Sequence, residues 1–230
     1  MTSEPTATPS GGGLAVEARG LSVRGPRGWV FRDVDLTVPA GGLAAVAGAA
    51  GSGRTSLLLT LGGRMKPTSG TVLFGGRPRR PRDVRRRAAL GVMAGVNELD
   101  PALTVREHVS EALDLREGLW GRRRGRDARI RRAVERVGLD VDPRTLAGDL
   151  TPEETCLLGA ALALVGEPEL LLLDDVDEGL PSERRSALWR RLRAIADTGV
   201  TVIATCHDAA PADGTAQRVP LSDDDGEARR

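Results

Sequence analysis

The chain has 230 residues, an apolar content of 40% and a formal net charge of +1. That length suits one domain of ordinary size, and the apolar fraction is enough to build a core. The balanced charge argues against a protein that binds nucleic acid or membranes over its whole surface. No apolar run approaches the roughly 20 residues needed to span a bilayer. Two distant cysteines, Cys156 and Cys206, fit a reducing compartment.

The two ends of the chain differ in composition from the rest. Residues 1–13 are small and polar with a glycine triplet, so we expect a flexible lead and no signal peptide. Residues 222–230 are expected to form a loose acidic tail, which leaves 14–221 as the folded domain. Together with the cysteine usage, these features predict a cytoplasmic protein.

Strand-like segments follow the lead in close order, at 16–23, 34–38 and 43–47. The third is a continuous apolar run that enters a glycine-rich loop, as a buried parallel strand would. A helix is expected after that loop, at 55–61, ended by Gly62 and Gly63. A further strand is expected at 71–74.

Two arginine-rich stretches come next. Residues 77–87 hold seven arginines, but no aromatic residue is interleaved to stack on bases, so a solvated loop is favoured over a nucleic-acid patch. Residues 122–136 hold eight more. There Ile130, Val134 and Val137 form one apolar stripe with a charged outer face, which predicts a surface helix. We therefore expect no direct nucleic-acid partner.

The pattern is helical from 99 to 164 and then alternates. It predicts a strand at 169–173, a helix at about 182–196 and a strand at 200–204. Strands that alternate with helices indicate a parallel α/β sheet, with the helical stretch at about 98–164 as an inserted subdomain.

The glycine-rich loop reads GAAGSGRTS and matches a phosphate-binding loop at every position but one. It follows an apolar strand and precedes a helix, where backbone N–H groups and the helix N-terminus favour phosphate. The candidate residues are Gly48, Ala49, Ala50, Gly51, Ser52, Gly53, Arg54, Thr55 and Ser56. Arg54 stands in the lysine position. In a chain whose only lysine is Lys66, this change is either drift or a selected change of function, and both interpretations stay open.

A second motif, LLLLDD, ends a predicted strand with two acids. Ligands of α/β sheets lie at the carboxyl ends of the strands. Asp174 is therefore expected to hold Mg²⁺ through water, with Thr55 as a direct ligand. The alternative, an acidic turn after a core strand, is disfavoured because the glycine-rich loop lies upstream.

With both motifs in place, the chain resembles an ABC-type ATPase, the nucleotide-binding subunit of ABC transporters. The resemblance spans Leu14 to Asp208 and rests on GGLAAVAGAAGSGRTSLLLTLGG, KPTSGTVLFGG, LDPALTVREHV, LTPEETCLLGAALALVGEPELLLLDD, EGLPSERRSALWRRL and TVIATCHD. It implies an α/β P-loop NTPase core with an antiparallel β edge and an inserted helical subdomain, with ATP and Mg²⁺ as ligands.

The resemblance also implies site roles. Asp175 stands where the family has the glutamate that polarises the attacking water, and His207 stands where a histidine touches the γ-phosphate. The residues of the signature region, LSGGQ in the family, are Leu150, Thr151, Pro152, Glu153 and Glu154. The chain departs from the family at three further positions. The base-stacking aromatic residue falls near Gly25, with Trp29 as a candidate substitute. The family's glutamine falls at Gly95, with Asn97 nearby, and its aspartate falls at Pro181.

The signature region has a physical interpretation of its own. Thr151 is expected to cap a helix whose first position is Pro152 and whose capping box is closed by Glu154. The family uses this helix start to grip the γ-phosphate bound to a partner subunit. Here Pro152 has no N–H, and we expect Glu153 and Glu154 to face the phosphate position.

The leading interpretation is an ATP-binding subunit of an exporter, with slow hydrolysis. It would lie at the inner face of the cell membrane through a separate transmembrane permease, and pair with a second ATPase subunit, a heterodimer being favoured. A regulatory subunit with little or no ATPase activity is the first alternative. A soluble ABC protein acting on nucleic acid or ribosomes is the second, disfavoured because 230 residues leave no room for two cassettes.

Overall fold

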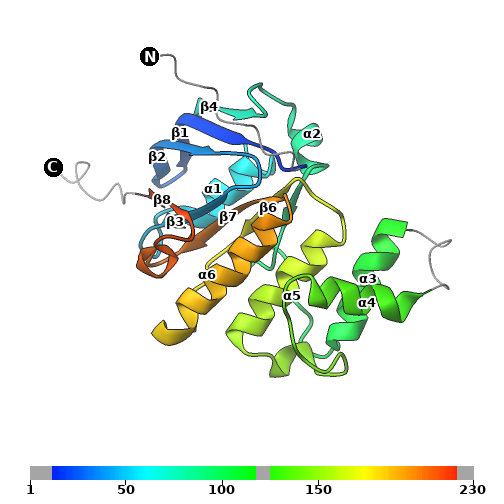
Figure 1. Cartoon of the computed structure of the whole chain (residues 1–230). Coiled ribbons are helices and arrows are strands. Elements are labelled where there is room, and N and C mark those ends of the chain that lie inside the picture. Colours follow the sequence, from blue (N-terminus) through cyan, green and yellow to red (C-terminus); the bar gives the residue numbers. More distant parts are fainter. Residues whose placement is uncertain (1–11, 118–124, 222–230) are drawn as a thin grey trace, which may run out of the picture.

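The computed structural model describes residues 12–117 and 125–221. Residues 1–11 of the flexible lead expected at 1–13, the tail expected at 222–230 and part of the second arginine-rich stretch lie outside these ranges. Two β-sheets and a helical lobe make up the fold, with the helical lobe on one side of the sheets (Figure 1). None of the helices in the described ranges combines the length and the apolarity needed to cross a bilayer.

The strands form a three-stranded antiparallel sheet, in the order β2-β1-β4, and a five-stranded parallel sheet, in the order β5-β6-β7-β3-β8. Their bounds are β1 Val16–Gly25, β2 Gly28–Val38, β3 Leu43–Ala47, β4 Ser69–Phe74, β5 Ala88–Leu90, β6 Leu170–Leu173, β7 Thr201–Cys206 and β8 Gln217–Pro220. The parallel sheet and the antiparallel edge confirm the predicted fold class.

The helices alternate with the parallel strands or gather in the helical lobe. Their bounds are α1 Arg54–Leu61, α2 Pro81–Arg85, α3 Val105–Glu117, α4 Arg126–Glu135, α5 Pro152–Leu164 and α6 Ser182–Asp197, with short 3₁₀ turns at Ala147–Asp149 and Ala210–Ala212. Ile130 and Val134 of α4 are buried, as their spacing predicts.

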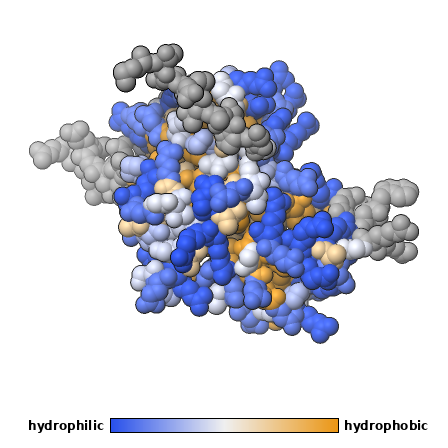
Figure 2. Space-filling model, viewed as in Figure 1, coloured by the Kyte–Doolittle hydropathy of each residue, from blue (hydrophilic) through white to orange (hydrophobic). Residues whose placement is uncertain are grey.

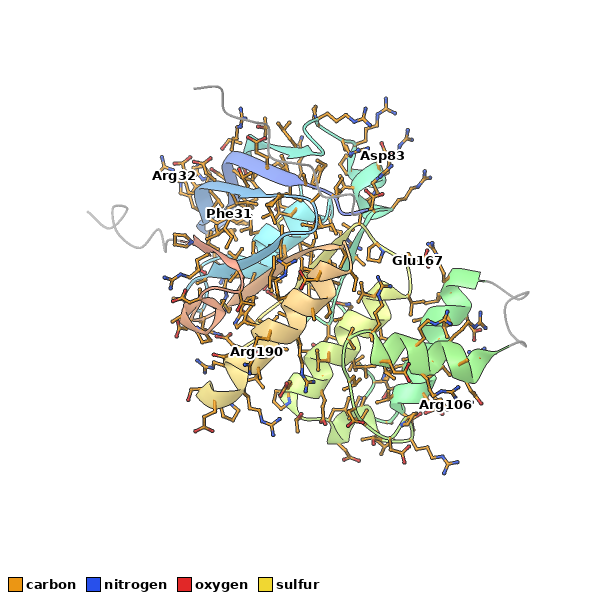
Figure 3. All side chains as sticks on the ribbon, in the orientation of Figure 1. Phe31, Arg32, Asp83, Arg106, Glu167 and Arg190 are labelled. Carbon is orange, nitrogen blue, oxygen red and sulfur yellow. The ribbon has the colours of Figure 1, made fainter. Side chains whose placement is uncertain are left out.

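Alternation along the central strands divides the core in two. In β3, Leu43 and Ala45 pack with the helices α3 to α6, whereas Ala44 and Val46 pack with α1 and the antiparallel sheet. Successive side chains of a strand point to opposite faces, so this five-residue strand joins both cores. The same alternation separates Phe31, 1% exposed, from the exposed Arg32 on β2 (Figure 3).

Polar contacts join the first two helices of the helical lobe. Arg106, at the start of α3, donates to Asp127 of α4 at 2.6 Å (Figure 3). Arg126 of α4 makes a two-pronged contact with Asp114 of α3, both distances being 2.9 Å. Paired guanidinium and carboxylate groups of this kind fix orientation as well as distance.

The expectation of a loop at 77–87 is wrong in part. Pro81 begins α2, where its missing N–H costs nothing, and Val84, 1% exposed, anchors the helix to the core. Two short strands, β5 and β8, and the first half of β2 were not predicted from the sequence. There Trp29 and Phe31 pair with Arg24 and Val23 of β1, because antiparallel pairing outweighs the arginines and glycines around them.

Candidate functional site

The loop between β3 and α1 has a backbone that only glycine can form at its tightest points. At Gly53 φ is +86°, and a Cβ there would lie 2.3 Å from the carbonyl oxygen of Val30. At Gly48 a Cβ would lie 2.4 Å from Oγ of Ser52. Glycine at these two positions therefore allows the backbone to approach β2 and the Ser52 side chain closely, in the tight turn that a phosphate-binding loop requires.

Helix α1 begins with no side-chain cap and no acidic residue in its first turn. The first N–H groups of any helix lack intrahelical acceptors and carry partial positive charge. Beside them, the hydroxyl of Ser52 has no hydrogen-bond partner, although the residue is only 5% exposed. This set of unfilled donors fits phosphate oxygens.

Arg54 turns back into the loop instead of extending from it, and is 6% exposed. Its Nη1 donates to the carbonyl oxygens of Gly48 and Cys206, the latter at 3.0 Å. Its Nη2 lies 3.1 Å from Nε2 of His207 and 2.8 Å from Oδ1 of Asp175. Both terminal nitrogens of the guanidinium are therefore engaged by the protein, which compensates the burial of its charge.

Thr55 and Asp174, the two residues predicted to hold Mg²⁺, are in direct contact. Thr55 Oγ1 donates to Oδ2 of Asp174 at 2.6 Å, and Thr205 Oγ1 donates to Oδ1 of the same carboxylate at 2.6 Å. A hydroxyl that donates its hydrogen keeps its lone pairs free. Thr55 can therefore present oxygen to a cation while it holds Asp174 in place.

The donor set fits Mg²⁺ held jointly by protein and ligand. Within residues 12–117 and 125–221, no group of three or more His, Cys, Asp or Glu side chains could hold a metal by itself. Magnesium in nucleotide sites takes one or two protein oxygens and completes its shell with water and phosphate oxygens. Thr55 and Asp174 supply that partial set.

Asp175 occupies strained backbone next to Asp174. Its φ is +42°, in the left-handed region that costs a residue with a side chain free energy, and its N–H donates to Oγ1 of Thr205 at 2.8 Å. Burial raises the pKa of Asp175, the nearby charge of Asp174 raises it further, and Arg54 opposes both. The contact with Arg54 is an ion pair whose atoms are not aligned as a hydrogen bond.

His207 follows β7 and is held by Asp177, a residue that sequence analysis missed. The backbone N–H of His207 lies 3.0 Å from each carboxylate oxygen, and Nδ1 of the imidazole lies 3.3 Å from Oδ1. Asp177 is 2% exposed. A carboxylate so deeply buried is a signal that only the structure reveals, because an acid in a turn after a strand is ordinarily solvated.

The start of α5 shows the predicted capping box. Thr151 Oγ1 accepts from the N–H of Glu154, and the Glu154 carboxylate accepts from the N–H and hydroxyl of Thr151, each at 2.8 Å. Pro152 takes the first helical position. Local chemistry therefore satisfies this helix start without a ligand.

The expectation that Glu153 faces the phosphate position is wrong. Its side chain is 7% exposed and lies 3.2 Å from Nη1 of Arg184 and 3.6 Å from Nε of Arg191, both on α6. The two guanidinium groups draw the carboxylate into the protein because burial of an unpaired charge would be costly. Only Glu154, partly exposed, keeps its charge at the mouth of the helix.

A cavity of about 470 Å³ lies beside the acids. Thr55, Asp174 and Asp175 line one part of it, and Pro152 with other residues of the α5 start lines another. Glu98, which sequence analysis missed, also lines it. Asn97, the amide near the position of the family's glutamine, donates to the carbonyl oxygen of Gly91 at 2.8 Å.

Trp29 stands on β2, one residue before the Val30 carbonyl that approaches Gly53. It is 37% exposed, and the guanidinium carbons of Arg24 and Arg32 lie 5.5 and 5.3 Å from its ring centroid. Those distances are within the range of cation–π contacts. An exposed aromatic ring in contact with two arginines therefore stands on the residue before the backbone that contacts the loop.

Residues 31–177 match the family model described as ABC transporter. The chain is 33% identical over 201 residues to the lipoprotein-releasing system ATP-binding protein LolD of Syntrophotalea carbinolica, with 84% of this chain and 87% of that protein covered. It is 31% identical over 183 residues to the Nod factor export ATP-binding protein I of Burkholderia lata. That match covers 77% of this chain but 58% of the relative, so the chain spans little over half of that protein.

Solved structures share the fold at lower identity. CbiO1 of Clostridium perfringens, part of the ABC transporter complex cbiONQ, superposes with a TM-score of 0.71 at 22% identity, covering 89% of this chain and 86% of that one. A dimeric ATP-binding cassette in a post-hydrolysis state with ADP and Pi superposes with a TM-score of 0.69 at 22% identity, covering 90% and 94%.

Proposed function

The chain belongs to the ABC transporter family as an ATP-binding subunit, and from this premise we propose that it couples MgATP binding and slow hydrolysis to a separate membrane subunit that exports or releases its cargo. The proposal rests on one observation. The Thr55 hydroxyl donates to Asp174 directly beside a glycine-rich loop, and that loop leads into a helix with no side-chain cap. The direction of transport is proposed from the two relatives whose names describe release and export.

The residues divide the work as follows. The loop N–H groups and the Ser52 hydroxyl bind the phosphates. Thr55 and Asp174 would hold Mg²⁺, which would supply charge stabilisation for phosphoryl transfer. Asp175 orients the attacking water from a carboxylate one methylene shorter than glutamate. The shorter reach and the ion pair with Arg54, at 2.8 Å, support slow turnover.

We propose a second ATPase subunit, different from this chain, as a partner. The start of α5 is filled by its own capping box and lacks the N–H of its first helical residue, Pro152. Two copies of this chain would each present such a helix start to the other's nucleotide. A different subunit with an open helix start would leave one usable site, formed with this chain's phosphate loop.

We place the membrane subunit in a groove of about 900 Å³ between the sheet lobe and the helical lobe. Hydrophobic residues reach the surface between these lobes, whereas hydrophilic residues cover most of the rest of that face (Figure 2). Val96 and Leu115, 47% and 90% exposed, both line the groove. Its lining also holds four arginines and no carboxylate among the described residues: Arg64, Arg85, Arg86 and Arg116.

The positive charge of these four arginines indicates what kind of segment binds in the groove. Burial and the nearby charge of Arg85 lower the pKa of Arg64, as expected where positive charges gather without an acid. We therefore propose that a short amphipathic cytoplasmic segment of the membrane subunit, with acidic side chains toward the arginines, binds here.

Two measurements test the proposal. The purified chain should hydrolyse ATP slowly in a steady-state assay that depends on Mg²⁺, and it should co-purify with a membrane protein from its native host. The double change Arg85→Glu with Arg116→Glu should abolish co-purification and leave ATP binding intact. The control is Arg190→Glu, an exposed arginine on α6 (Figure 3). Equal recovery of the membrane protein with both variants would contradict this docking site.

The regulatory alternative rests on one observation, the engagement of Arg54 by four protein groups. An arginine held in this way is less available to phosphate than a flexible lysine. Titration with a fluorescent ATP analogue should still saturate, because the loop N–H groups remain. Arg54→Lys should raise turnover. Saturable binding with no turnover in either form would favour the regulatory role over the enzymatic one.

A further inference from the structure

The two histidines of the chain, His108 and His207, lie in environments that dictate opposite tautomers. Nε2 of His108 lies 3.0 Å from the carbonyl oxygen of Asp100. A carbonyl oxygen accepts and never donates. His108 therefore carries its hydrogen on Nε2, and it provides an internal reference for the second histidine.

The Asp177 side of His207 requires a hydrogen on Nδ1. The buried carboxylate accepts from the backbone N–H of His207 and of Asp208, and such contacts favour the charged form, which has no hydrogen to give. Nδ1 lies 3.3 Å from Oδ1 of that carboxylate. An ionised carboxylate can only accept, so the imidazole must be the donor of this contact.

The Arg54 side of His207 leads to the same tautomer independently. Nη2 of Arg54 lies 3.1 Å from Nε2 of the ring. A guanidinium has donors and no acceptor. Nε2 must therefore present its lone pair, which it can do only when the ring hydrogen is on Nδ1.

We propose that Asp177 is a positioning residue that holds His207 as the Nδ1–H tautomer, so that Nε2 accepts from Arg54 and keeps the guanidinium folded into the loop. In this state Nε2 has no hydrogen to offer a phosphate. The contact that the family resemblance assigns to this histidine is thus replaced by an internal chain from Asp177 through His207 and Arg54 to Asp175. This loss of the phosphate contact rests on the proposed nucleotide site, whereas the tautomer assignment does not.

The test is a long-range ¹H–¹⁵N correlation spectrum of the nucleotide-free, histidine-labelled full chain, at a pH well above the usual titration range of imidazole. The wild type should show one Nδ1–H ring and one Nε2–H ring. Asp177→Asn should convert the first to Nε2–H and thereby break its contact with Arg54. The amide oxygen takes over the two backbone N–H groups, so the amide nitrogen, now a donor, faces Nδ1.

His108 is the control in every spectrum, and Asp100→Asn should leave both rings unchanged because His108 contacts only the backbone carbonyl of that residue. Asp177→Ala serves as a second variant: without the carboxylate that holds the ring against Arg54, His207 should leave that contact and also lose the Nδ1–H signal. Two Nε2–H rings in the wild type would overturn the proposal. So would an unchanged His207 tautomer in both Asp177 variants while His108 reports an intact fold. Because no nucleotide is present, neither result depends on ATP binding or turnover.

Discussion

Helices α1 and α5 both begin at positions where the sequence pattern of the family places a phosphate, yet their first turns are built in opposite ways. Helix α1 has Gly53 as its N-cap residue, no side-chain cap and no acid in the first turn. Helix α5 has a complete capping box, proline at its first position and two acids in its first turn. A helix start can thus be optimised for its own stability or left open for an anion, and this chain does one at each site.

The difference teaches what a ligand contributes at such a site. At α1 the first N–H groups have no side-chain acceptor and are available to phosphate. At α5 the N–H groups of Thr151 and Glu154 already have side-chain acceptors, so an incoming phosphate would have to displace Glu154 from Thr151. The energetic preference for anions that a helix dipole offers is typically 0.3–1 kcal/mol, and a carboxylate already in place removes much of it.

The largest effect is expected at the acid beside α1. Asp174→Asn removes the charge that we propose faces Mg²⁺ and weakens the contacts with Thr55 and Thr205. Mg²⁺-dependent hydrolysis should fall by on the order of 1,000-fold, because metal stabilisation is worth several kcal/mol. Steady-state ATPase measurements check this, with Asp213→Asn, an exposed acid paired with Arg218, as the control. Equal loss in the control would point to a general defect.

The next change lengthens the neighbouring carboxylate. Asp175→Glu should speed hydrolysis, on the order of 100-fold at most, because it moves the carboxylate about 1 Å closer to the attacking water. Single-turnover kinetics with excess protein separate this effect from product release. If the rate does not change, the length of the side chain does not limit the reaction and the ion pair with Arg54 becomes the better explanation.

A smaller effect is expected at α5. With ATP and Mg²⁺ in excess, the hydrolysis-slowed Asp175→Asn variant should sediment as a monomer at micromolar concentration. Adding Pro152→Gly and Glu154→Gly opens the helix start and should strengthen self-association about tenfold, since two symmetric sites each gain up to about 1 kcal/mol. Glu153 is left unchanged because it is buried against Arg184. A stable dimer of the variant without these two changes would refute the idea.

The smallest effect concerns stability alone. Thr151→Ala removes the cap of α5 and should lower the free energy of unfolding by about 1 kcal/mol, or Tm by about 2–4 °C for a chain of this size. Thr155→Ala makes the same substitution one turn later and should be neutral. Differential scanning calorimetry compares the two. Equal melting temperatures would mean that tertiary contacts, and not the capping box, hold the start of this helix.

The sequence predicted those parts of the site whose chemistry is local. The loop at 48–56, the pairing of Thr55 with Asp174 and the capping box of Thr151 each depend on neighbours in the chain or on strand ends that a parallel sheet brings together. The fold class followed from the alternation of strands and helices, because such alternation leaves few topologies.

The parts that were missed depend on contacts distant in sequence. Glu153 is turned inward by arginines about thirty residues away, and Asp177 is buried by the loop that follows β7, thirty residues on. Neither contact leaves a periodic pattern. Arg54 shows the same limit, since its identity was plain but its inward course depends on acceptors at Cys206 and His207.

Because β3 packs into both cores, it firmly anchors the phosphate-binding loop that follows it. Four of its five residues are at most 3% exposed, and the strand is hydrogen bonded on both sides, to β7 and β8. Releasing it would open both cores at once, so its amide hydrogens should exchange only through global unfolding. Beyond Ala47, only Ala49, Ala50 and Gly51 of the loop are exposed, so the exposed tip of the loop is carried by a strand that opens last.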